Sequence, residues 1–313
     1  MRTLAALTRE GLSEAWAARR VVLLVWLIHL VLAAAATFPL WQSLRSVVGS
    51  LPEADVLRTG IVFGALTDLA EMRPGLPGAF GATLVAVAVL GVLVGAGVNG
   101  GVLEVLSGSG ERRSLGQRFG QGAGRFFGRF LGMALLVGAL AAIVGGLAML
   151  PFAQLTRSYF RTGSGPGWLA PLGGAAVGGL VLLLALLVLD ASRIHVVRSD
   201  AGGLSGLRAG LALVLRHPLL WGGTWLANAV LVGMAVLLFV LFRQAVPTDR
   251  GALILAMVLA QQALVFVRTG LRVALLASET ALVERLRPSP RPGATVGAPT
   301  ARQSGSSASP VPV

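Results

Sequence analysis

The chain has 313 residues, of which 55% are hydrophobic and 12% are charged, and its mean hydropathy is +0.80. Ordinary globular proteins carry about twice that charged fraction, so the composition excludes a water-soluble domain and indicates an integral membrane protein. All 26 basic residues are arginine, and the chain contains no cysteine. Without lysine or cysteine, the chain has no lysine nucleophile, P-loop lysine, disulfide, thiolate nucleophile or cysteine-bound metal.

Six apolar segments are long enough to cross the hydrocarbon core of a bilayer, which takes about 20 residues of helix. Because a spanning segment must satisfy its own backbone hydrogen bonds, each segment is predicted to be an α-helix. The predicted fold class is therefore all-α, a polytopic membrane helical bundle, with residues 1–285 as its six-helix transmembrane domain. The predicted spans are Val21–Phe38, Phe80–Val98, Phe130–Phe152, Leu172–Leu189, Leu219–Phe242 and Ala252–Val273.

The arginine distribution predicts how the chain is oriented. The termini and the loops on their side of the membrane hold 17 arginines, whereas the loops on the other side hold 7. Since positively charged loops stay in the cytoplasm, both termini are predicted to be cytoplasmic, in a bacterial inner membrane. The formal net charge of +13 also favours contact with anionic lipid headgroups of the bilayer. Nucleic acid is not an expected partner, because no single groove could collect arginines from four separate segments.

A threefold pattern is visible on the arginine-rich side of the predicted membrane. Three times, a short amphipathic stretch is followed by an outward span, a loop and a returning span; the stretches are residues 4–20, 114–129 and 204–216. We predict that they form amphipathic elbow helices in the cytoplasmic headgroup zone, with Ser114 as the N-cap of the second. Any six-span chain with both termini on one side has three hairpins, so the alternative is that no internal repeat exists.

Two further segments lie outside the predicted spans. Between Pro39 and Pro77, the spacing of apolar residues predicts one or two amphipathic helices that form an outer cap over the bundle. Residues 286–313 are rich in Pro, Ser, Gly and Ala without apolar periodicity, which predicts a disordered cytoplasmic tail.

Small residues four positions apart predict close packing between the spans. Such pairs occur at Gly91/Gly95, Ala142/Gly146 and Gly174/Gly178. In a membrane, small side chains allow helix backbones to approach each other. A tight bundle is therefore expected.

Polar side chains within the spans are few, and three of them would form a cluster near the midplane: His29, Asn228 and Gln261. Burial of polar groups in hydrocarbon costs free energy, so such a cluster needs a role that offsets this cost. We favour hydrogen bonding between the helices. The alternative is a functional role, in proton relay or ligand binding. The three histidines lack metal-ligand spacing, and no nucleophile motif is present. No catalytic residue, metal or cofactor is therefore predicted.

Charged residues cluster where the spans reach the cytoplasmic boundary. They are Glu104, Asp190, Arg193, Arg268 and Arg272. Asp190 and Arg193 stand three positions apart, a spacing that places them on one helix face. We predict an ion-paired cluster that fixes the inner ends of the helices, with a substrate gate as the alternative.

The segments Leu189-Asp-Ala-Ser-Arg-Ile-His-Val-Val, Gly206-Leu-Arg-Ala-Gly-Leu and Arg216-His-Pro carry a resemblance. They resemble uncharacterised six-span bacterial membrane proteins and, more loosely, are similar to the membrane domain of some glycerophosphodiester phosphodiesterases. The resemblance implies a polytopic bundle with amphipathic elbows but supplies no catalytic residue. The soluble phosphodiesterase domain is missing from this sequence, so that activity is not expected.

The sequence favours a non-enzymatic inner-membrane protein, either a scaffold or an accessory subunit that binds membrane protein partners. Helix-packing and interfacial features are abundant, whereas charges inside the spans are scarce. The alternative is a transporter or flippase for a small or lipidic substrate. A carrier of ionic substrates should place charge at the midplane, but a carrier of a lipidic substrate need not.

Overall fold

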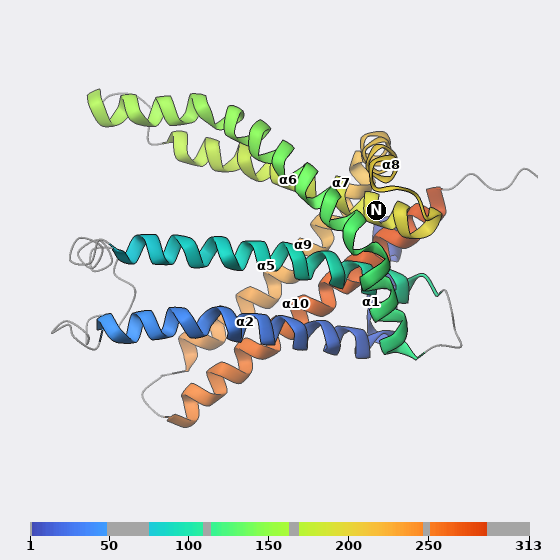
Figure 1. Cartoon of the computed structure of the whole chain (residues 1–313), viewed down its shortest axis with the longest axis horizontal. Coiled ribbons are helices and arrows are strands. Elements are labelled where there is room, and N and C mark those ends of the chain that lie inside the picture. The colour runs from blue at the N-terminus through green and yellow to red at the C-terminus, as the bar shows by residue number, and fades with distance from the viewer. Residues whose placement is uncertain (1, 49–74, 109–113, 163–168, 247–250, 287–313) are drawn as a thin grey trace, which may run out of the picture.

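The computed structural model describes residues 2–48, 75–108, 114–162, 169–246 and 251–286. Within these ranges every secondary-structure element is an α-helix, which confirms the predicted all-α class. The helices, labelled as in Figure 1, are α1 (Arg2–Ala17), α2 (Arg19–Val48), α5 (Gly75–Leu106), α6 (Leu115–Thr162), α7 (Ala170–Ser199), α8 (Gly203–Arg216), α9 (Pro218–Ala245) and α10 (Gly251–Leu286).

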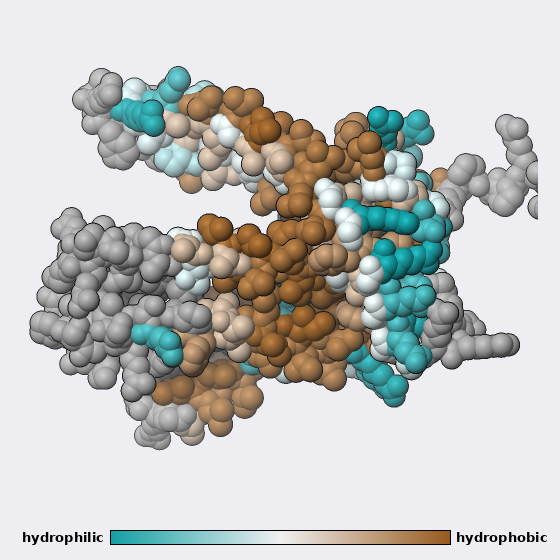
Figure 2. All heavy atoms as spheres, in the orientation of Figure 1, coloured by the Kyte–Doolittle hydropathy of each residue, from teal (hydrophilic) through white to brown (hydrophobic). Residues whose placement is uncertain are grey.

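Six of the described helices, α2, α5, α6, α7, α9 and α10, are long and apolar enough to cross a membrane. They correspond to the six predicted spans. Large apolar side chains along them are exposed, and Figure 2 shows the resulting hydrophobic surface across the middle of the molecule. Soluble monomers rarely expose apolar patches of this size, so the chain is an integral membrane protein.

The predicted elbow helices are present at one end of the bundle, on the right in Figure 1. We call this end the elbow end. α1 and α8 are separate helices that precede α2 and α9, whereas the second elbow continues without interruption into the span of α6. Ser114 is its N-cap, as predicted, because the backbone N–H of Gln117 donates to Ser114 Oγ (3.4 Å) and that of Ser114 donates to Gln117 Oε1 (3.2 Å).

Each elbow helix packs on the returning helix of another unit: α1 on α10, the elbow of α6 on α5, and α8 on α7. The close approaches occur at glycines whose missing Cβ would collide with the partner helix, namely Gly11 against Ala274, Gly122 against Gly100 and Gly210 against Ser192. Since α1 belongs to the first unit and α10 to the last, these contacts arrange the three units in a closed ring. This cyclic order favours a genuine threefold repeat over the alternative.

The α6–α7 hairpin diverges from α5 as it leaves the elbow end (Figure 1). The predicted close packing is confirmed at Gly174, where a Cβ would lie 3.2 Å from Met149 Sδ on the neighbouring helix. It is wrong at Gly91 and Gly95 of α5 and at Gly146 of α6, because no neighbouring atom of the described residues lies within 4 Å of a Cβ built at these positions. These glycines therefore face open space rather than another backbone.

Two predicted segments fall largely outside the described residues. Helix α2 ends at Val48 and α5 begins at Gly75, so the central part of the predicted outer cap, residues 49–74, is not described. Helix α10 ends at Leu286, and the predicted tail beyond it is not described either.

Candidate functional site

A buried ion network joins α7 to α10 near the elbow end. Arg272 on α10 donates two hydrogen bonds to the Asp190 carboxylate on α7, from Nη1 to Oδ2 and from Nη2 to Oδ1, both at 2.7 Å. Arg193 Nη1 donates a longer bond, 3.2 Å, to Asp190 Oδ1. The side chains of Asp190 and Arg193 are 3% and 8% exposed. The bidentate Arg272–Asp190 pair is the stronger contact, because both carboxylate oxygens are engaged in parallel.

Charge within this network is unevenly matched. Asp190 offers one negative charge to two guanidinium groups, and Arg272 already occupies both of its oxygens. Arg193 Nε is buried and has no hydrogen-bond partner among the described residues, and its guanidinium carbon lies 5.7 Å from the ring centre of Phe130. Arg193 is thus a buried cation whose charge and donors are only partly satisfied, a costly state in a low-dielectric environment.

Glu279 on α10 is a fourth buried ionisable residue near the network. Its relative exposure is 0%, and neither carboxylate oxygen has a hydrogen-bond partner among the described residues. The charges of Asp190, Arg272 and Arg193 act on it through space. Sequence reasoning missed Glu279 because it lies beyond the apolar window of the last span. The available signal was a polar triplet, residues 278–280, inside a stretch that is otherwise apolar.

The other two predicted members of the ion cluster lie elsewhere. Glu104 belongs to the junction of α5 and α6, where Arg118 Nη2 donates to the carbonyl oxygens of Glu104 (3.3 Å) and Val105 (2.9 Å). Arg268 is exposed on α10 and forms no ion pair with any described residue. The structure therefore brings together Asp190, Arg193 and Arg272 only.

The predicted midplane residues lie on three different helices. His29 on α2 and Gln261 on α10 are exposed, and Asn228 on α9 is half-buried. Helix α10 packs on both α2 and α9, but no hydrogen bond links the three side chains in the described chain. The polar midplane cluster thus stays a prediction from the sequence.

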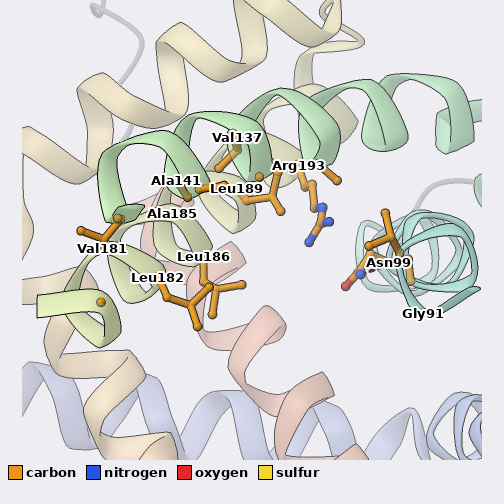
Figure 3. Close-up of a pocket in the computed structure, with 17 residues that line it drawn as sticks. Gly91, Asn99, Val137, Ala141, Val181, Leu182, Ala185, Leu186, Leu189 and Arg193 are labelled. Carbon is orange, nitrogen blue, oxygen red and sulfur yellow. Dashed lines mark hydrogen bonds between the residues drawn. The ribbon is translucent and has the colours of Figure 1, made fainter. Parts of the chain in front are cut away.

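A partly open cavity of about 610 Å³ lies between α5, α6 and α7, next to the ion network. Its walls are apolar or small residues, apart from two polar side chains, Asn99 and Arg193. Figure 3 shows these two side chains extending toward each other from α5 and α7. Each stands nearer the elbow end than the other lining residues of its own helix. The rest of the lining includes Gly91, Val137, Ala141, Val181, Leu182 and Leu186. The cavity therefore has one polar end and a long apolar remainder.

The cavity exists because side chains are missing from its walls. No atom lies within 4 Å of a Cβ built at Gly91, Gly95 or Gly138, which all line it. Along α7 the lining runs from Gly178 to Arg193. That stretch is about 22 Å long at 1.5 Å per residue, a large part of the ~30 Å hydrocarbon thickness.

A second, exposed ion cluster holds the elbow of α6 against the end of α7. Arg125 Nη2 lies 2.8 Å from Asp200 Oδ2, and Arg129 Nη1 lies 2.7 Å from Asp200 Oδ1. Asp200 is the C-cap of α7 and has a φ of 50°, in the left-handed region that Asp tolerates better than most residues. The hydrogen bonds from Arg129 and Arg125 hold the pKa of Asp200 below its ordinary value.

Comparison of the chain with protein-family models, curated proteins and solved structures finds no match. The resemblance noted from the sequence therefore stays a prediction. Within the described ranges, no group of three His, Asp or Glu side chains is placed to hold a metal ion. What the fold and the site define is a polytopic helical membrane protein with an apolar cavity that ends at a buried arginine.

Proposed function

We propose that this integral membrane protein binds a lipidic substrate in the cavity between α5, α6 and α7 and acts as a transporter or flippase for it. The observation that carries the proposal is the cavity itself: about 610 Å³, apolar along most of its length and polar at one end. Ligand sites of about 300–1,000 Å³ with apolar walls and a few polar groups are the usual form of small-molecule sites.

The scarcity of charge in the spans agrees with this proposal. A lipidic substrate needs an apolar path, which glycine, alanine, valine and leucine on α5, α6 and α7 provide. The scaffold or accessory-subunit function favoured by the sequence needs only helix packing and interfacial elbows. It gives no reason for an apolar cavity between α5, α6 and α7.

In the proposed setting the protein lies in a bacterial inner membrane with both termini in the cytoplasm. The arginine-rich elbow end would then face the cytoplasmic headgroups, in accordance with the positive-inside rule. The exposed apolar residues of the elbow helices, such as Trp16 and Leu215, support this position because they would enter the interface while the arginines contact phosphate.

A lipid-translocation assay tests the proposed function. Purified protein is reconstituted into liposomes that carry an NBD-labelled phospholipid in both leaflets, and dithionite quenches the label that reaches the outer leaflet. We expect wild-type protein to expose inner-leaflet label that protein-free liposomes protect. Gly138→Leu, which fills the cavity from α6, should abolish this effect.

Gly132→Leu is the matched control, because Gly132 lies on the same helix, also has no atom within 4 Å of a built Cβ, and does not line the cavity. It should behave like the wild type. Equal activity of Gly138→Leu and Gly132→Leu, or no activity in any sample, would count against the proposal. Mild-detergent copurification gives a second comparison: retained lipid supports the transporter function, and stoichiometric protein partners support the scaffold function.

A further inference from the structure

We infer that the cavity selects an amphiphile with an anionic oxygen-bearing head, a carboxylate or a phosphate, which Arg193 binds while the apolar chain lies between α6 and α7. This inference rests on the proposed function and adds the chemical class of the substrate. It also assigns Arg193 as the residue that determines specificity.

The first argument is the state of the Arg193 side chain. Arg193 has a relative exposure of 7%, lines the cavity, and has a buried Nε without a hydrogen-bond partner in the part of the chain that the structure describes. Its one ion pair, 3.2 Å to Asp190 Oδ1, uses an oxygen that also accepts a 2.7 Å bond from Arg272. An anion in the cavity would add an acceptor and a further negative charge beside this guanidinium.

The second argument is the arrangement of the polar groups. Asn99 Nδ2 donates one hydrogen bond to the carbonyl oxygen of Gly95 at 2.6 Å, which fixes the amide beside the cavity. The other N–H of this amide has no partner in the described chain. Figure 3 shows the Arg193 and Asn99 side chains extending toward each other from α7 and α5, so both can contact one oxygen-bearing head.

The third argument separates an anionic head from other heads. A cationic head would be repelled by Arg193 and Arg272, which both lie close to Asp190. A neutral head would add no negative charge beside Arg193. Hydrogen bonds to a charged group contribute about 1.5–3 kcal/mol, so the acidic form of a ligand should bind roughly 10- to 100-fold more tightly than its neutral analogue.

The test compares ligands that share one apolar chain. Palmitic acid, methyl palmitate and palmitoyl lysophosphatidic acid are titrated against the protein in a mild detergent, and bound ligand is measured by native mass spectrometry. The acidic ligands should bind more tightly than the ester by the stated factor. The order of the two acids distinguishes a carboxylate ligand from a phospholipid-derived one.

Arg193→Gln should reduce the affinity for the acids to that for the ester and leave ester binding unchanged. The variant is expected to fold, because Asp190 keeps both of its bonds to Arg272. Arg268→Gln is the control, since it removes an exposed arginine of α10 that has no ion pair in the described chain.

Equal binding of acid and ester by the wild type, or an unchanged acid preference in Arg193→Gln, would overturn the inference. The proposed function would still stand in that case if Gly138→Leu abolished binding of both ligands. If Gly138→Leu left all affinities unchanged, the cavity would not be the binding site, and both proposals would fall.

Discussion

Replacement of Asp190 by asparagine is the most direct test of the ion network. The substitution keeps the size of the side chain but removes the negative charge that holds two arginines. Asp190 is 3% exposed, and loss of one partner from a buried ion pair costs about 3–5 kcal/mol. Because the side chain of Arg272 is only partly buried, at 39% exposed, we expect a somewhat smaller loss of about 2–4 kcal/mol in unfolding free energy.

Equilibrium unfolding by SDS in mixed micelles, followed by circular dichroism, measures this loss. Arg268→Gln should change the unfolding free energy by less than about 0.5 kcal/mol, as surface substitutions usually do. Arg193→Gln should cost less than Asp190→Asn, because Asp190 then still pairs with Arg272 whereas Asp190→Asn leaves two cations unmatched. If Asp190→Asn cost no more than Arg268→Gln, the network would not clamp α7 to α10, and the reasoning from buried charge would be wrong.

Three further predictions concern the glycine packing at the elbow end, the Asp200 ion pairs and the membrane orientation. Gly122→Ala should destabilise the protein by about 1–3 kcal/mol, because its Cβ would lie 2.4 Å from Glu104 Cβ. Gly120→Ala should instead stabilise it by up to about 1 kcal/mol, because no neighbouring atom of the described residues lies within 4 Å of the added Cβ. The same unfolding assay compares the two variants, and equal effects would contradict the packing of α6 on α5. The depressed pKa of Asp200 means that its pairing stabilises the fold above about pH 4 and that this contribution is lost as the pH falls through the folded-state pKa. The melting temperature of the wild type should therefore exceed that of Asp200→Asn at pH 6, with the difference vanishing in acid; a difference independent of pH would argue against the ion pairs. The chain has no cysteine, so single cysteines can be labelled with a membrane-impermeant maleimide. Ser43→Cys should react in intact cells, whereas Ser205→Cys should react only after the cytoplasmic side is opened. The reverse pattern would refute the predicted orientation.

The spans and elbows could be predicted because they depend on composition along the chain. A run of about 20 apolar residues has few alternatives to a spanning helix, and amphipathic stretches with terminal arginine indicate interfacial helices. The continuity of α6 was less predictable, since its glycines weaken the helix locally. The capping box at Ser114 and the packing on α5 offset that weakness, which is a tertiary effect.

The candidate site could be predicted only in part, because it depends on helix rotation and on the distance between helices. Arg268 and Arg272 are one turn apart on α10, yet only Arg272 pairs with Asp190. Gly91 and Gly95 fit the pattern of a helix contact equally well, and the divergence of α6 and α7 makes them cavity walls instead. Glu279 is buried by neighbouring helices that its local sequence does not reveal.

The ring of elbow contacts has a consequence for biosynthesis. The second elbow packs on α5 and the third on α7, and the ribosome has already synthesised both of these helices. Each of these elbows can therefore pack on its partner helix as soon as it is made. The first elbow, α1, has to wait for α10, and about 270 residues separate the two partners. At about 5–20 residues per second, α1 spends on the order of 10 to 50 s without its partner. Throughout that time α10 does not yet cover the α1 face formed by Leu7, Gly11 and Ala15. Insertion of the last span is therefore the event that completes the fold.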